Sequence, residues 1–193
     1  FSIQDARQIK KIEKKTNHDV KAVELFIVEK LKKLKLSKLC EFVHFCCTSE
    51  DINNLSYSLM LQRFLDIEFI PEVNFIQKNL NSLAKKYSKL SMLAFTHGQP
   101  ASPTTLGKEF SNYSYRVKFH LDLIKRIKQK GKFNGASGNY NAHVVTEKKV
   151  NWEALSKKFV NSLGLDFSSH STQIELKDAM ACQLANTHNL NNV

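Results

Sequence analysis

The sequence contains few residues that interrupt helices, and it lacks long apolar runs. Its 193 residues include six glycines and three prolines, too few for a β-sandwich or barrel with many turns. No stretch of about 18 apolar residues is present, so we expect no transmembrane helix. The first residues show no basic segment followed by an apolar run, so we expect no secretion signal there. The chain begins inside a helical pattern without Met and ends without a helix stop signal, so we expect it to be part of a longer protein.

Cysteine is scarce, and its spacing indicates neither a disulfide framework nor a zinc site. The four cysteines are Cys40, Cys46, Cys47 and Cys182, and no pair has the C-x-x-C spacing. The adjacent Cys46 and Cys47 do not readily bond to each other or act as a pair of zinc ligands. We therefore expect reduced, buried thiols and a cytoplasmic protein.

Negative charge is also in short supply. The formal net charge is +11, carried mainly by lysine, which suits nucleic acid, an anionic surface or a small anionic substrate. The lysines are spread along helix faces, and the aromatic residues occur at core spacing rather than between them. A nucleic-acid module more often combines clustered charge with stacking aromatics. We therefore favour a small-molecule substrate over nucleic acid or a membrane, and salt-sensitive DNA or RNA binding would test the alternative.

Helical periodicity is what the sequence has in abundance. Apolar residues recur at steps of three or four through nearly every segment, and no alternating strand longer than a few residues competes. Pro71 lies within the longest run and should kink or restart that helix, because proline lacks a backbone N–H. A helix of that length needs partner helices to cover it, so we predict an all-α protein built as a long-helix bundle. The runs cover residues 20–34, 52–87, 106–124, 152–163 and 179–184.

Capping residues predict where the helices begin. Three Thr-x-x-acid segments, at residues 16–19, 48–51 and 172–175, have the form that caps a helix N-terminus. Ser102 followed by Pro103 has the form of a cap with proline at the first helical position. The loops that we expect between helices cover residues 96–103 and 131–143.

Four polar clusters lie at junctions between loops and helices. A helix N-terminus offers free N–H groups and the positive end of the helix dipole, so it suits a carboxylate or a phosphate. The hydroxyls of Thr48 and Ser49 would add donors there, whereas Glu50 and Asp51 occupy part of the same positive end. Helix capping alone also explains Thr48 and Asp51. The clusters consist of Asn17, His18 and Asp19; Thr48 and Ser49; the segment from Thr96 to Gln99; and Gln173.

His97 carries the side chain best suited to donate a proton near neutral pH. It lies between Thr96 and Gly98, and a loop with glycine and proline can hold its ring in one orientation. A structural or solvated histidine is the alternative, for His97 and for His18 alike. The other histidines show no metal-ligand spacing, and no P-loop, dinucleotide fingerprint or nucleophile elbow is present, so we expect neither a metal nor a cofactor.

Six segments, taken together and in order, resemble the fumarase/aspartase superfamily, and within it the adenylosuccinate lyases of the long bacterial type. Any one segment is modest evidence, but their order along essentially the whole chain is specific. The segments are TNHDVKAVE at 16–24, EFVHF at 41–45 with CTSEDINNL at 47–55, THGQPASP at 96–103, GKE at 107–109, GNYNAH at 138–143 and TQIE at 172–175.

This resemblance implies a fold and a reaction. The fold is a helical bundle that assembles as a homotetramer with active sites shared between subunits. Residues 1–45 would end an N-terminal helical domain and residues 46–193 would begin the central bundle, with the C-terminal remainder absent. The reaction is a β-elimination that releases fumarate from adenylosuccinate, giving AMP, and from the succinylated carboxamide ribotide SAICAR, giving AICAR. The carboxylates, phosphate and carbanion of such a reaction suit fixed positive dipoles.

The resemblance also assigns roles by position. His97 matches the general acid that protonates the departing nitrogen. The residues that match substrate-binding positions are Asn17, His18, Asp19, Thr48, Ser49 and Gln173.

The sequence departs from the family pattern in several places. Phe95 stands where the family often has Arg, and Leu176 stands where a Pro is common. The family's base is a serine on a mobile loop, and neither that loop nor an N-terminal Arg-Tyr pair is present. We therefore expect activity from the complete enzyme and not from this chain alone. Two alternatives stay open: a sister lyase, such as one acting on argininosuccinate, and a non-catalytic helical interaction protein.

Overall fold

A computed structural model describes residues 1–193, and helices dominate it. About 65% of the residues are helical and 9% are in strands, which confirms the predicted all-α class. No helix has both the length and the hydropathy that crossing a bilayer requires. The chain divides into two compact units, Phe1–Ser58 with Lys130–Leu176, and Leu59–Gln129 with Lys177–Val193.

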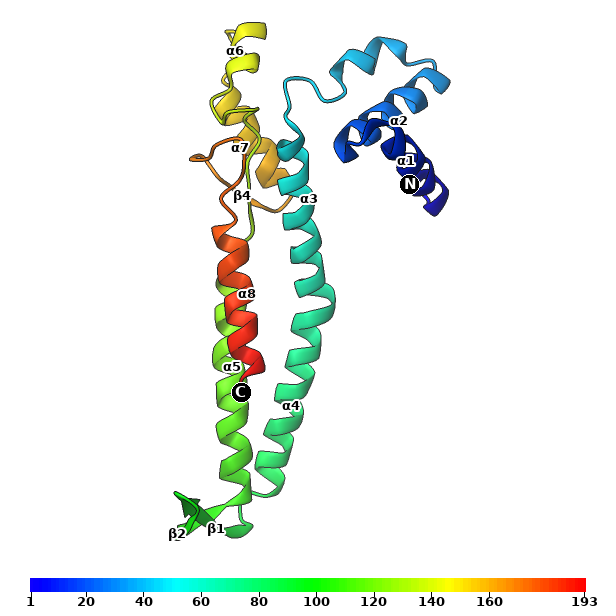
Figure 1. Cartoon of the computed structure of the whole chain (residues 1–193). Coiled ribbons are helices and arrows are strands. Elements are labelled where there is room, and N and C mark those ends of the chain that lie inside the picture. The colour runs from blue at the N-terminus through cyan, green and yellow to red at the C-terminus, as the bar shows by residue number, and fades with distance from the viewer. The chain divides into compact units, whose positions relative to one another are not determined.

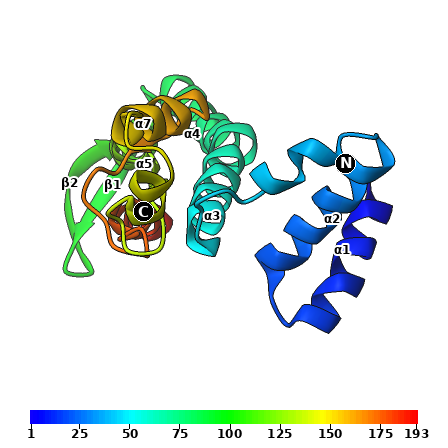
Figure 2. The ribbon, with the colours of Figure 1, turned by 90° about the horizontal axis from the view of Figure 1, so that it is seen from above.

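The first unit combines the beginning of the chain with a later segment. α1 and α2 lie side by side (Figure 2), and the Asp5 carboxylate of α1 lies 2.9 Å from the Lys30 ammonium of α2. The two short strands β3 and β4 pair in parallel, with Lys130 opposite Asp166. The elements are α1 (Ile3–Thr16), α2 (Asp19–Lys33), the 3-10 helix η1 (Ser37–Phe42), the start of α3 (Ser49–Phe64), β3 (Lys130–Gly131), α6 (Asn141–Thr146), α7 (Trp152–Ser162) and β4 (Asp166–Phe167).

The second unit begins at Leu59 within α3, which passes through a π-helical turn, η2 (Leu65–Phe69), into α4 (Ile70–Lys86). In this turn the Ile70 N–H donates to the Leu65 carbonyl, five residues back. Pro71 follows directly in the first turn of α4. The helix does not restart there but continues through the π-helical turn, because Phe64, Phe69 and Ile70 all keep right-handed helical backbone angles.

The remaining elements of the second unit are a hairpin and two helices. α5 lies beside α4 and beside α8, and the hairpin lies at the end where α4 leads into α5 (Figure 1). Gly107 allows α4 and α5 to approach closely, because a Cβ there would lie only 2.6 Å from the Ser88 backbone nitrogen. The elements are β1 (Ser91–Thr96), β2 (Gln99–Thr105), α5 (Leu106–Arg126) and α8 (Asp178–Asn191).

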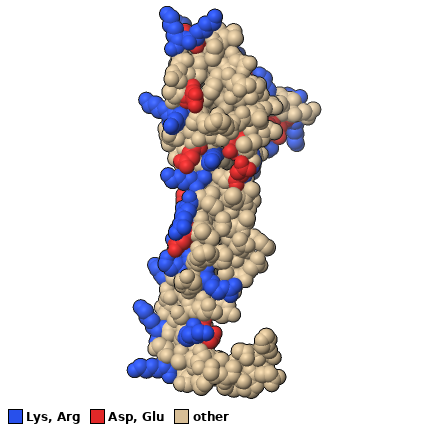
Figure 3. Space-filling model, turned by 90° about the vertical axis from the view of Figure 1, so that its left-hand side faces the viewer, with Lys and Arg blue, Asp and Glu red and all other residues tan.

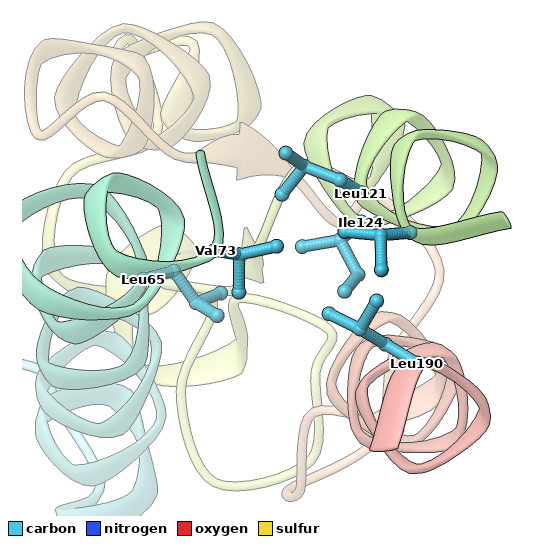
Figure 4. Packing of buried hydrophobic residues seen from close by; sticks show 6 residues of the cluster. Leu65, Val73, Leu121, Ile124 and Leu190 are labelled. Carbon is cyan, nitrogen blue, oxygen red and sulfur yellow. The ribbon is translucent and has the colours of Figure 1, made fainter. Parts of the chain in front are cut away.

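A small apolar core holds the helices of the second unit together. Leu121 and Ile124 of α5 are each 2% exposed and face α4 and α8 (Figure 4). At about 25 cal/mol per Å² of buried apolar surface, such side chains each contribute about 2 kcal/mol. The buried cluster consists of Leu65, Val73, Val117, Leu121, Ile124 and Leu190.

The predicted loop at residues 96–103 is wrong, because this segment forms the turn and most of the second strand of a β-hairpin. β1 and β2 are antiparallel, with Thr96 opposite Gln99. Ser102 and Pro103 lie within β2, so they do not begin a helix as predicted. Thr105 caps α5 instead, because its hydroxyl accepts the N–H of Lys108 at 3.2 Å.

Two of the three Thr-x-x-acid caps are also wrong. α1 continues to Thr16 and ends at Asn17, whose φ of 49° is left-handed, so the cap of α2 moves to His18. Residues 172–175 cap no helix, because α8 begins only at Asp178. One of the two hydrogen bonds of the third cap is confirmed: the Asp51 carboxylate accepts the Thr48 N–H at 2.9 Å.

Candidate active site

The turn between α1 and α2 presents the first predicted cluster. His18 Nδ1 accepts the Lys21 N–H at 3.2 Å, so the imidazole itself caps α2. Asp19 lies in the first turn of the same helix, where a carboxylate is stabilised by the helix dipole. The turn opens into a hollow of about 730 Å³, and its lining consists of Lys10, Glu13, Lys14, Asn17, His18 and Asp19.

The second cluster lies at the start of α3 and contacts the first. His18 Nε2 lies 3.2 Å from the Ser49 hydroxyl oxygen, so the first and second clusters are in direct contact. The Asn53 amide donates to the Asp19 carboxylate at 3.4 Å, one turn further along α3. The structure therefore brings together His18, Asp19 and Ser49, which come from two separate sequence motifs.

The segment after β3 contributes polar groups that the sequence analysis missed. Lys132 Nζ lies 2.9 Å from Asp51 Oδ1, and both side chains are enclosed. The N–H groups of Asn134 and Gly135 each donate to the same carboxylate at 3.1 Å. About 80 residues separate the partners, so no periodicity or capping signal could have revealed the contact.

Gln173 is exposed on a segment that is anchored to the same loop. The Asn134 amide donates to the Ser171 hydroxyl at 2.8 Å. Gly138, with a φ of +80°, approaches the backbone of Ser171 and Thr172 so closely that a Cβ would overlap it. The loop from 132 to 138 therefore contacts both the start of α3 and the segment that carries Gln173. The predicted loop at 131–143 is confirmed for residues 132–140, whereas Gly131 lies in β3 and residues 141–143 begin α6.

His97 occupies a different position, in the second unit. It forms the two-residue turn of the β1–β2 hairpin together with Gly98, with φ values of 51° and 74°. Left-handed conformations at both positions are typical of a type I′ turn. The imidazole is exposed and makes no hydrogen bond within the chain, so it is available to a group from outside the chain.

His143 is the histidine that the structure removes from consideration as a proton donor. It is 2% exposed, and its ring packs edge-on against Tyr140 and Trp152 at centroid distances of 5.5 and 5.0 Å. Neither ring nitrogen has a hydrogen-bond partner. Burial lowers the pKa of His143, so the ring is held neutral.

The cysteines and charged groups complete the chemical inventory. All four thiols are free, but the prediction that they are buried is wrong, because Cys40, Cys46 and Cys47 are half-buried and Cys182 is exposed. Burial and the nearby Asp51 carboxylate raise the pKa of the Cys47 thiol to about 12, so Cys47 is not a nucleophile. No group of three His, Cys, Asp or Glu side chains is arranged to hold a metal ion. Figure 3 shows Lys and Arg in separate groups, with Asp and Glu beside several of them, rather than in one basic patch.

The comparison with family models defines the class of protein. A protein-family model with the description "Lyase" matches residues 1–192 of the chain. The chain therefore belongs to the lyase family.

Several curated relatives are more specific. The chain is 48% identical over 182 residues to an adenylosuccinate lyase of Buchnera aphidicola subsp. Schizaphis graminum, covering 94% of this chain and 40% of that protein. Adenylosuccinate lyases of Haemophilus influenzae and Escherichia coli K12 are 47% and 46% identical over 92% and 94% of this chain. The chain spans 39% and 40% of their lengths. The resemblance seen in the motifs is thereby confirmed.

Solved structures show the same fold. A fumarate lyase from Mesorhizobium sp. BNC1 superposes with a TM-score of 0.77, covering 100% of this chain and 43% of that one. A β-carboxy-cis,cis-muconate cycloisomerase from Acinetobacter calcoaceticus sp. ADP1 gives 0.74, covering 95% and 41%. Both proteins are 18% identical to this chain in sequence, so the two superpositions support the fold and nothing beyond it.

Proposed function

We propose that the complete protein containing this chain is an adenylosuccinate lyase. The observation that carries the proposal is the 46–48% identity to curated relatives of that name over 92–94% of the chain. The reaction is the β-elimination of fumarate from adenylosuccinate, which leaves AMP. The same chemistry releases fumarate from SAICAR and leaves AICAR, so the protein would act in purine nucleotide biosynthesis.

In this proposal the first unit binds the anionic groups of the substrate. Thr48 and Ser49 contribute hydroxyl groups at the start of α3. Asn17, His18 and Asp19, in the turn from α1 into α2, contribute an amide, an imidazole and a carboxylate. A helix N-terminus stabilises a carboxylate or phosphate through free N–H groups and the helix dipole. Gln173 adds an exposed amide from the neighbouring segment.

His97 is the proposed general acid. Its exposed ring on a tight turn is free to donate a proton to the nitrogen that departs with AMP or AICAR. The hairpin restricts the backbone at His97 to one conformation, and this restriction reduces the entropy lost when the ring is oriented. The base would come from outside this chain.

The assembly proposed for the complete protein is a cytoplasmic homotetramer with active sites formed by several subunits. Within it, residues 1–45 would end the N-terminal domain and residues 46–193 would begin the central bundle. Large apolar side chains that stay exposed on the single chain along α3, η2 and α4 support an assembly that covers them. They include Tyr57, Met60, Phe64, Ile67, Phe75 and Ile76.

The test is fumarate release by the full-length protein. Purified protein is mixed with adenylosuccinate, SAICAR or argininosuccinate, and fumarate is quantified by a coupled assay. We expect release from the first two substrates and none from argininosuccinate. Release from argininosuccinate alone would identify a sister lyase, and no release from any substrate would favour the non-catalytic interaction protein.

A further inference from the structure

A buried ion pair holds the start of α3, and neither partner has an assigned role in the proposed site. The side chains of Lys132 and Asp51 are 0% and 1% exposed and lie 2.9 Å apart. Lys132 Nζ also donates to the Gly135 carbonyl at 3.0 Å, while Asp51 accepts the backbone N–H groups of Asn134 and Gly135. Each charge therefore has several partners, which is what a pair removed from water requires.

The same carboxylate reaches the residues proposed to bind substrate. Asp51 Oδ2 accepts the Thr48 N–H at 2.9 Å, which fixes the backbone where α3 begins. Ser49 is the next residue, and its hydroxyl oxygen lies 3.2 Å from His18 Nε2. A shift of the Asp51 carboxylate would therefore move the turn from which both hydroxyls project.

α3 also binds the backbone around Lys132. The Lys132 N–H donates to Asn54 Oδ1 at 2.9 Å, and Asn54 Nδ2 donates to the Lys132 carbonyl at 3.1 Å. Ser58 donates to the Lys130 carbonyl at 2.7 Å. Asp51, Asn54 and Ser58 are spaced by three and four residues, so they form one stripe on the helix. This stripe fixes the register of the segment against α3 and so determines where the ammonium lies.

The ion pair also affects the charge at this helix end. An isolated carboxylate in the first turn would offset the positive end of the dipole and repel an anion. The ammonium 2.9 Å from Asp51 neutralises that carboxylate. Glu50 is then the only first-turn carboxylate of α3 not neutralised by Lys132, so the pair removes part of the negative charge that would oppose a phosphate or carboxylate at this N-terminus.

We propose that Lys132 and Asp51 are positioning residues for substrate binding. The ion pair holds Thr48 and Ser49 in the geometry that binds an anionic group of the substrate, and it neutralises the Asp51 carboxylate at that helix end. Lys132 does not contact the substrate, because its side chain is fully enclosed. The inference rests on the proposed role of Thr48 and Ser49 in substrate binding.

The test uses the full-length protein with the double substitution Asp51→Asn and Lys132→Met. This change removes both charges at similar side-chain volume and leaves no lone buried charge. Lys130→Met is the matched control, because Lys130 is exposed and only its carbonyl contacts α3. We expect the KM for adenylosuccinate to rise roughly tenfold in the double variant, as for loss of one charge-assisted hydrogen bond. We expect kcat to stay within about threefold, because general acid and base are untouched.

Amide hydrogen exchange provides a readout that does not depend on turnover. Residues 48–51 should exchange faster in the double variant and at the wild-type rate in Lys130→Met, since only the double variant loses the carboxylate that accepts the Thr48 N–H. If circular dichroism shows that the double variant does not fold, Lys132→Arg replaces it, because the broader guanidinium keeps the charge and displaces the carboxylate.

The outcomes separate this inference from the proposed function. A double variant with the KM of Lys130→Met, or with a reduced kcat at unchanged KM, overturns the positioning role. If the wild-type protein releases no fumarate, the proposed function fails. In that case, unchanged amide exchange at residues 48–51 in the double variant overturns the inference. Faster exchange supports the claim that the ion pair holds the backbone at the start of α3.

Discussion

Replacing only one member of the buried ion pair should have a large and asymmetric effect on stability. Lys132→Met leaves Asp51 buried without a counter-charge, which costs about 3–5 kcal/mol. Three backbone N–H groups, of Thr48, Asn134 and Gly135, still donate to that carboxylate, so we expect about 3 kcal/mol. Asp51→Ala removes their acceptor and leaves the ammonium with one carbonyl, so we expect about 5 kcal/mol.

Native-state hydrogen exchange of α3 in the full-length protein measures this difference locally, without requiring two-state unfolding. Lys130→Met again serves as the control, and its effect should stay within about 0.5 kcal/mol, as for other surface changes. A loss below about 1 kcal/mol for Lys132→Met would refute the reasoning, because a buried unpaired carboxylate cannot be that inexpensive. A smaller loss for Asp51→Ala than for Lys132→Met would refute the proposed asymmetry.

Three further predictions concern the site and the loop behind it. Replacing Thr48 and Ser49 together by Ala should weaken substrate binding beyond the roughly 1 kcal/mol stability loss of a missing cap, and unchanged affinity in the folded variant would return them to capping. Gly138→Ala should destabilise the protein by about 2 kcal/mol or more, because its φ is +80° and the new Cβ would overlap Ser171; an unchanged Tm would contradict this. Because burial lowers the pKa of His143 below 6.5, the unfolded chain binds a proton that the folded chain does not. The stability contributed by neutral His143 is therefore complete above about pH 6.5 and is lost as the pH falls, so His143→Phe should flatten the stability profile below pH 6.5, as followed by urea unfolding.

The helices were predictable from the sequence because burial on one face imposes a period that a single sequence displays. The run at 106–124 corresponds to α5 at Leu106–Arg126, and the run at 52–87 corresponds to the continuous helix of α3, η2 and α4. The hairpin was not predictable in the same way. Nearly all of β1 is exposed, so it carries no alternation of apolar and polar residues, and β2 contains two prolines.

In the candidate site, too, only the local contacts could be predicted from the sequence. The cap formed by Thr48 and Asp51 is local, so its spacing was visible in the sequence. The contact of Ser49 with His18 joins residues 31 positions apart in the sequence, and the contact of Asp51 with Lys132 joins residues 81 positions apart. No local pattern encodes such distances. Asp51 therefore looked like an obstacle to anion binding, whereas the structure shows its charge neutralised.

The role of His97 is tested most directly by turnover of the complete protein carrying His97→Gln. We expect kcat for adenylosuccinate cleavage to fall by about 10²–10⁴, the usual contribution of a positioned general acid, with KM little changed. His188→Gln, at an exposed histidine of α8, should retain wild-type turnover. Near-normal turnover of His97→Gln would contradict the assignment of His97 as the proton donor.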